Sequence, residues 1–271
     1  MRWVTASPGR RGGLLMGVLP LLVLALAYVI AAAARHADNP ADKILPLPGA
    51  MASAMASLLF EADPLSGQYL FWADTLASLW RLGAGLGIAT TSALLVGLVL
   101  GALPPVRTTL GPLVTAIAVV PPIALLPILF IVFGLGETAK VALIVVGVAP
   151  FMIRDVAGHI AALPREQVIK ALTLGANSWG VMLRVALPQA MPRLIEGLRL
   201  SLGPAWVFLI SAEAIAADVG LGYRIFLVRR YLAMDVILPY VAWIAVLAVV
   251  MDLALSQASR RLFGWAHLGA R

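Results

Sequence analysis

The sequence predicts an all-α integral membrane protein of about six transmembrane helices, and three observations support this fold class. First, 62% of the 271 residues are hydrophobic and the mean hydropathy is +0.97, far above the values of soluble domains. Second, the apolar residues gather in long runs. Third, only 12% of residues are charged, and the net charge of +7 comes from scattered basic residues, which is typical of cytoplasmic loops rather than of nucleic-acid binding. The absence of cysteine excludes disulfides and zinc–cysteine sites.

The first transmembrane helix is predicted at residues 14–34, a run of 21 uncharged residues. At 1.5 Å per residue, this run crosses a hydrocarbon core of ~30 Å. Arg10 and Arg11 precede it, so the positive-inside rule places the N-terminal tail in the cytoplasm. The competing interpretation is a cleaved signal peptide, but the run exceeds the ~7–15-residue core of such peptides. Residues 1–34 are therefore predicted to form a cytoplasmic tail and a retained first helix.

Residues 35–82 are predicted to form an extracytoplasmic segment, because prolines divide its first part into short pieces. Within it, residues 50–61 and 69–82 have the apolar spacing of helices that lie along a membrane surface. The transmembrane core is predicted at residues 83–271. It begins with an apolar run at 83–103, whose five glycines allow neighbouring helices to approach closely.

Four further transmembrane helices are predicted, at residues 113–133, 141–153, 200–217 and 236–251. The first of these carries three prolines, whose freed carbonyl groups can face neighbouring helices or a water-filled path. The second has only 13 uncharged residues, so it must recruit flanking residues to span the bilayer. With six spans, both termini are predicted to lie in the cytoplasm.

The fourth and fifth predicted spans are separated by a polar, basic segment that begins at Pro164 and ends at Pro188. Pro164 suits the first turn of a helix, and Glu166 complements the dipole of that helix. Gly175 is placed to end it, because glycine takes the left-handed conformation at little cost. Asn177 or the residue after it can cap a second short helix, which Pro188 limits. Two short helices joined at a glycine predict a knob that a partner outside the membrane can grip.

This segment resembles the second half of the EAA motif of ABC importer permeases, which ends in Gly-x9-Ile-x-Leu-Pro. Gly175 is followed after nine residues by 185–188 (VALP), and Ala171 matches the last alanine of the motif. Ile169 and Lys170 depart from the expected Glu and Ala. Other segments are similar to the nitrate/sulfonate/taurine/bicarbonate branch of that family, and the resemblance covers roughly residues 44–265. These segments are 44–48, 121–127, 133–137 with Lys140, 197–199, 212–213 and 220–223.

The resemblance implies a permease subunit of an ATP-driven importer in the bacterial cytoplasmic (inner) membrane. It implies three kinds of partner: a second copy of the permease, two cytoplasmic ABC ATPase subunits and an extracytoplasmic substrate-binding protein. ATP and magnesium would be bound by the ATPase, so that this chain would hold no cofactor and no metal. The residues implied at the ATPase contact are Glu166, Lys170, Ala171, Gly175, Ala176, Asn177, Leu187 and Pro188.

The resemblance also implies the substrate class. The family branch implies a small polar nutrient such as nitrate, a sulfonate, taurine or bicarbonate. The C-terminal segment 259–267 (SRRLFGWAH) also resembles permeases associated with urea- or guanidine-type nitrogen metabolism.

Glu213 is the ionisable residue set inside an apolar run, 14 residues after the arginine at the inner boundary of its span. This separation corresponds to roughly 21 Å along a helix, in the outer half of the membrane, where a charge needs a partner or water. Two interpretations are open: Glu213 lines the translocation path or holds a gate closed, or it is an interfacial carboxylate paired with an arginine such as Arg224. Trp206, Pro121 and Pro122 are the other candidates for the translocation path.

No motif for nucleotide binding or hydrolysis occurs in the sequence. G-x-x-x-x-G-K-S/T, H-E-x-x-H and G-x-S-x-G are absent, so the sequence predicts a transport subunit without catalytic residues rather than an enzyme. The alternative function is an ion-gradient-driven secondary transporter. That class has internal repeats with intramembrane acids at matching positions in both halves, and the sequence has neither.

Overall fold

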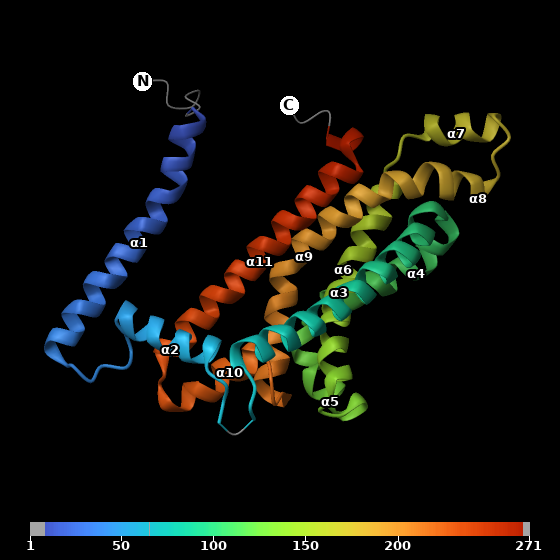
Figure 1. Ribbon diagram of the computed structural model, residues 1–271. Helices are drawn as coiled ribbons and strands as arrows, with labels where there is room; N and C mark the ends of the chain where they lie inside the picture. The colour runs from blue at the N-terminus through green and yellow to red at the C-terminus, as the bar shows by residue number, and fades with distance from the viewer. Residues whose placement is uncertain (1–8, 65, 268–271) are drawn as a thin grey trace.

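The structure is a computed structural model that describes residues 9–64 and 66–267, and this part of the chain is helices joined by short turns (Figure 1). Five helices are long and apolar enough to cross a membrane, and the bent pair α4–α5 makes a sixth. The predicted all-α membrane fold is confirmed. The helices are α1 (Arg10–Asp38), α2 (Pro48–Phe60), α3 (Leu70–Ala102), α4 (Pro104–Val119), α5 (Leu126–Phe133), α6 (Glu137–Ala161), α7 (Arg165–Thr173), α8 (Ser178–Val181), α9 (Leu187–Ala216), α10 (Leu221–Val228) and α11 (Met234–Leu262).

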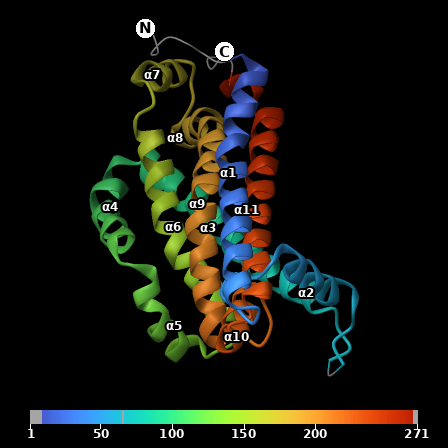
Figure 2. The ribbon, with the colours of Figure 1, turned by 90° about the vertical axis from the view of Figure 1, so that its left-hand side faces the viewer.

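The bundle has two ends, which we name after the short helices they carry. α7 and α8 lie at one end, the α7 end, where α1 begins and α11 ends (Figure 1). α10 lies at the opposite end, the α10 end. α4 and α5 cover one flank of the bundle, and α2 projects from the other (Figure 2). Most of the predicted N-terminal tail falls on residues 1–8, which lie outside the described residues.

Helices α3, α6 and α9 form the centre of the core, and glycines let α3 approach α6 closely. A Cβ atom added at Gly85, Gly97 or Gly101 would lie 2.6–2.9 Å from an isoleucine or valine side chain of α6. The predicted role of glycine in close packing is confirmed at these positions. It is wrong at Gly83 and Gly87, where an added Cβ would meet nothing within 4 Å.

The predicted surface helix at residues 69–82 is not a separate helix, because residues 70–82 are the first part of the 33-residue helix α3. The predicted boundary at residue 83 therefore lies inside α3. The polar residues Asp74, Ser78 and Arg81 do not face water, and each is at most 2% exposed. They face polar partners from the other end of the sequence, which the apolar spacing could not reveal. The other predicted surface helix corresponds to α2.

The third predicted span is not one helix, because the chain bends by 87° between α4 and the residues Pro122–Phe133. Pro121 and Pro122 lie at this break, since neither can donate a backbone hydrogen bond to the preceding turn. The span also begins earlier than predicted, at Pro104. The fourth predicted span does recruit flanking residues, because α6 extends over 25 residues.

Candidate functional site

The junction between α7 and α8 is a tight turn fixed by backbone hydrogen bonds. Gly175 has a φ of +86°, in the left-handed region. Its N–H donates to the carbonyl of Leu172 at 3.0 Å, and the N–H of Ala176 donates to the carbonyl of Ala171 at 3.0 Å. This pair of bonds is the Schellman arrangement that ends a helix at a glycine. The predicted helix end at Gly175 is confirmed.

Asn177 caps α8, as the sequence predicts. Its side-chain oxygen accepts a hydrogen bond from the N–H of Gly180 at 2.7 Å. On the far side of the knob, the side-chain amide of Gln189 in α9 donates to the side-chain oxygen of Gln167 in α7 at 2.9 Å. The two short helices are therefore held in one geometry relative to each other and to α9.

The second short helix does not end at Pro188, which corrects the prediction. α8 continues through one π-helical turn, Met182–Ala186, directly into α9. Pro188 lies in the first turn of α9, where a proline disturbs few hydrogen bonds. The wider π turn accommodates the ring, so Ser178–Ala216 is one uninterrupted helical run of 39 residues.

The predicted coupling residues all lie on this knob at the α7 end. Glu166, Lys170, Gly175, Asn177 and Pro188 are exposed, and Ala171, Ala176 and Leu187 are half-buried. Five large apolar side chains on the knob are also exposed, namely Ile169, Leu172, Leu174, Trp179 and Leu183. Exposed apolar side chains bordered by charged ones commonly mark a protein–protein contact, so the knob is suited to bind a partner protein.

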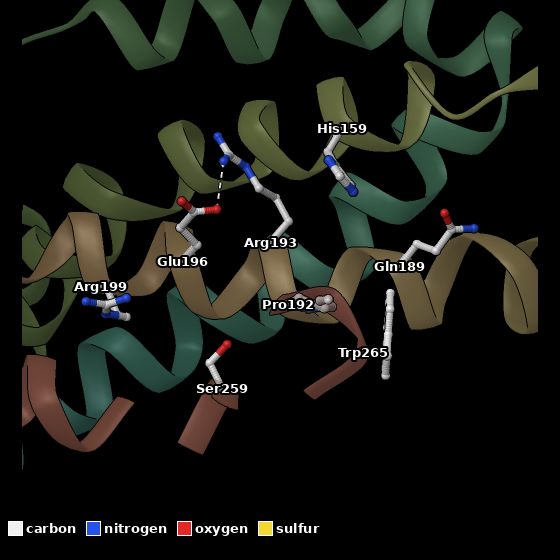
Figure 3. A pocket seen from close by; sticks show the side chains of 9 residues that line it. His159, Gln189, Pro192, Arg193, Glu196, Arg199, Ser259 and Trp265 are labelled. Carbon is white, nitrogen blue, oxygen red and sulfur yellow. Dashed lines mark hydrogen bonds and ion pairs between the residues drawn. The ribbon is translucent and has the colours of Figure 1, made fainter. Parts of the chain in front are cut away.

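A cavity of about 440 Å³ lies beside the knob, between α6, α9 and the segment after α11 (Figure 3). Arg193 lines it and is bonded to Asp155 of α6 and to Glu196. Arg199 lines it too and is bonded to Asp252 of α11 at 2.8 Å. Both cations are thus matched by carboxylates that tie α9 to its neighbours.

Glu213 lies in a buried polar cluster at the α10 end and is 0% exposed. Its carboxylate accepts hydrogen bonds from the Ser78 hydroxyl at 2.8 Å, from Arg81 at 2.7 Å and from the N–H of Gly222 at 2.8 Å. Glu213 is thus paired with an arginine, as one interpretation proposed, but that arginine is Arg81 rather than Arg224, and the pair is buried rather than interfacial. Sequence separation explains the error, because the two partners are 132 positions apart in the chain.

Arg81 connects Glu213 to α6. Its guanidinium also binds both carboxylate oxygens of Glu137, and Lys140 donates to the same carboxylate at 2.8 Å. Arg81 is buried, whereas the Glu137 side chain is 56% exposed, so the cluster reaches the surface there. Charge-assisted bonds of this kind are the strong ones in proteins.

A second ion pair in the cluster joins α3 to α10. Asp74 accepts hydrogen bonds from Arg224 at 2.8 Å, from the Tyr240 hydroxyl at 3.1 Å and from the N–H of Gly220 at 2.9 Å. Burial lowers the pKa of Arg224, but the hydrogen bond and charge of Asp74 raise it by more, so the net shift is upward. The guanidinium therefore stays charged at physiological pH.

The turn between α9 and α10 fits this cluster only with glycine at two positions. Gly220 has a φ of +139°, and a Cβ there would lie 2.6 Å from the Glu213 carboxylate. A Cβ at Gly222 would lie 2.8 Å from a backbone oxygen of α9. The N–H groups of residues 220–222 each donate to a side chain of the cluster. The cluster thus joins α3, α6, α9, α10 and α11, and removing one buried partner typically costs about 3–5 kcal/mol.

The predicted path residues lie in two places: Trp206 and Glu213 are seven residues apart on α9, and Pro121 and Pro122 are at the α4–α5 break. Trp206 is buried in the core, with its indole N–H lacking a partner among the described residues. Pro121 is exposed and Pro122 half-buried at the α4–α5 break. No group of three or more metal-ligating side chains occurs within residues 9–64 and 66–267.

Comparison with known proteins gives the family. Residues 89–264 match the model of the "binding-protein-dependent transport system inner membrane component" family. The taurine transport system permease protein TauC of Escherichia coli K12 is 38% identical over 195 residues, 72% of this chain and 70% of TauC. The putative aliphatic sulfonates transport permease protein SsuC of Bacillus subtilis 168 is 28% identical over 97% of this chain and 92% of its own.

A bicarbonate permease and a solved transporter are similar as well. The bicarbonate transport system permease protein CmpB of Synechococcus elongatus is 29% identical over 68% of this chain and 66% of CmpB. The inward-facing MetNI methionine ABC transporter aligns with a TM-score of 0.60 and 22% identity, over 72% of this chain and 95% of the matched chain. This last likeness concerns the fold alone. On the family match and the TauC identity, the chain belongs to the family of inner-membrane permease components of binding-protein-dependent ABC transport systems.

Proposed function

We propose that this permease works as one of two identical subunits of an ABC importer, with two separate ATPase subunits at the α7 end and a binding protein at the α10 end. In this arrangement the α7 end and both termini lie in the cytoplasm. The α7–α8 knob fits a cleft of the ATPase, and ATP-driven closure of the ATPases moves it as a rigid body. Bond chemistry, with ATP and magnesium, takes place in the ATPase.

The observation that carries this proposal is the exposed knob, which is locked by the Gly175 turn and the Asn177 cap. A loose loop would deform when pushed, whereas this segment has its backbone groups bonded in one geometry. The helical run Ser178–Ala216 then connects the knob to Glu213 without a break. Movement of the knob therefore reaches the cluster at the α10 end along one helix.

The buried cluster is the closed outer gate in this proposal. Glu213 holds the α9–α10 turn against Arg81 and Ser78 of α3. Opening a path at the α10 end separates α9–α10 from α3 and breaks these bonds. Glu213 thus acts by closing the end of the path rather than by facing the substrate.

The substrate is a small anion or zwitterion of the sulfonate kind. TauC and SsuC are named for taurine and aliphatic sulfonates, and CmpB for bicarbonate. Uptake of labelled taurine by cells that contain the complete transport system, with bicarbonate and urea as competitors, tests this class. Competition by urea without competition by sulfonates contradicts it.

The test of coupling is a pair of substitutions at one position. Gly175→Val places a β-branched residue in a left-handed turn, at a cost of about 1–2 kcal/mol, while an added Cβ meets nothing within 4 Å. Gly175→Asn is the matched control, because asparagine tolerates this conformation. We expect the valine variant to co-purify with the ATPase but to lose transport-coupled ATP hydrolysis, and the asparagine variant to keep it. Full coupling in the valine variant, or ATP hydrolysis by this chain without a second polypeptide, refutes the proposal.

A further inference from the structure

Two arginines near the α7 end lack a partner, unlike the other arginines described above. Arg107 in α4 and Arg154 in α6 take part in no ion pair or side-chain hydrogen bond within the described part of the chain. The Arg154 side chain is exposed, and it lies seven residues, or about 10 Å along the helix, before the end of the candidate span α6. Because the described residues supply no counter-ion for this exposed arginine on an apolar helix, a counter-ion can come only from outside them.

Both arginines line one cavity of about 330 Å³ between α3, α4 and α6. Among the described residues, the ionisable ones that line it are these two, and its other walls are apolar apart from one threonine. A neighbouring cavity of about 380 Å³ shares Arg107 and adds Arg165, again without a carboxylate. The positive charge of the arginines is therefore not neutralised by any carboxylate among the described residues that line the two cavities, so the site is suited to bind an anion.

The surface beside the cavity has a basic part at Arg107 and an apolar part along α4. Leu110, Leu113 and Ile117 follow Arg107 along α4 at intervals of three or four residues, and each is 42–57% exposed. The cavity itself equals the volume of roughly eleven water molecules, which suits a head group rather than a whole lipid. Basic head-group contacts therefore lie at the α7 end, and an apolar stripe leads from them toward the middle of the membrane.

We propose that this cavity binds the phosphate of an anionic phospholipid, with its acyl chain along the exposed stripe of α4. Basic pockets between transmembrane helices hold such head groups in other membrane proteins. Gly158 of α6 opens the cavity, because an added Cβ there would meet nothing within 4 Å. The site is independent of the knob and of the buried cluster, so it does not rest on the proposed coupling mechanism.

The experiment measures phospholipid retained by the purified full-length protein in detergent, by native mass spectrometry. Phosphatidylglycerol is the probe, phosphatidylcholine is the zwitterionic comparison and inorganic phosphate is the competitor. Each arginine contributes about a fivefold preference for the anionic lipid. We therefore expect Arg107→Gln and Arg154→Gln to lower the preference for phosphatidylglycerol about fivefold each. Arg260→Gln is the matched control, because this exposed arginine in the last turn of α11 lines neither cavity.

A second variant separates the groove from general surface charge. Gly158→Leu fills the cavity with both arginines in place and suits a helix interior. We expect it to reduce retention of phosphatidylglycerol at least fivefold. Unchanged preference in the double arginine variant overturns the proposal, and so does unchanged preference in Gly158→Leu. Displacement of the lipid by millimolar inorganic phosphate also overturns it, since the site is then one for small anions.

Discussion

The substitution Glu213→Gln tests the buried cluster most directly, because it keeps the size of the side chain and removes its charge. The two carboxylate oxygens accept from Ser78, from Arg81 and from the N–H of Gly222. Glutamine has one acceptor oxygen, so its NH₂ group must face either the guanidinium or the Gly222 N–H, with donor against donor.

The magnitude follows from the burial of the partners. Removing one partner of a buried ion pair costs about 3–5 kcal/mol. Arg81 keeps its contacts with Glu137, so we expect a cost near the lower limit, about 3 kcal/mol. Asp252→Asn is the matched control: it also converts an acid to its amide, but its pair with Arg199 is 33–41% exposed and contributes only about 0–1 kcal/mol.

The assay is thermal unfolding of the purified chain in one detergent, with the two variants and the unmodified protein side by side. We expect Glu213→Gln to lower Tm by several degrees and Asp252→Asn to change it little. Equal Tm values for the two variants would refute the reasoning, because they would mean that burial does not strengthen the cluster. Uptake measured well below both Tm values then tests the gate. We expect the uptake rate of the glutamine variant to differ from that of the unmodified protein, while its assembly with the ATPase is intact.

Three further substitutions test the packing and the knob. Gly97→Leu forces a side chain into the α3–α6 contact and should destabilise the protein by about 1–3 kcal/mol, whereas Gly87→Leu, which meets open space, should not; thermal unfolding compares them. Gly220→Ala places a Cβ 2.6 Å from the Glu213 carboxylate at a positive φ, and we expect a loss of stability comparable to that of Glu213→Gln, which a normal Tm would contradict. Asn177→Ala removes the α8 cap at a cost of about 1 kcal/mol and should lower transport-coupled ATP hydrolysis less than Gly175→Val does, with unchanged hydrolysis as the contrary result.

The knob could be predicted from the sequence because its signals are local. Pro164, Gly175 and Asn177 each act on backbone groups within a few residues, so their identity and spacing determine the turn. The error at Pro188 has a local cause as well. A proline limits a regular α-helix, but a π turn just before it removes the conflict, and no residue type marks such a turn in advance.

The buried cluster could not be predicted because its partners come from distant parts of the chain. The pairs Arg81–Glu213 and Asp74–Arg224 are separated by 132 and 150 residues. The spacing of apolar residues in the first part of α3 leaves a polar stripe on its other face. Such a stripe ordinarily faces water, so the sequence predicted a surface helix. The informative signal was the coincidence of this stripe with an acid inside a distant apolar run, since each needs the other to be buried. The break at Pro121 was missed for a related reason, because membrane helices often contain prolines without breaking.

The buried cluster and the knob use their charges in opposite ways, and this contrast bears on how the permease is driven. At the α10 end, three acids and three cations are matched with one another inside the protein, so separating them has a high cost. At the α7 end, Lys170 and Arg184 on the knob form no ion pair within the described residues and are left for a partner. A helical run of 39 residues joins the two ends. Movement of the knob can therefore be transmitted to the ion pairs of the buried cluster. Thermal motion alone rarely breaks these ion pairs, and a gate that opens only when ATP is used requires this property.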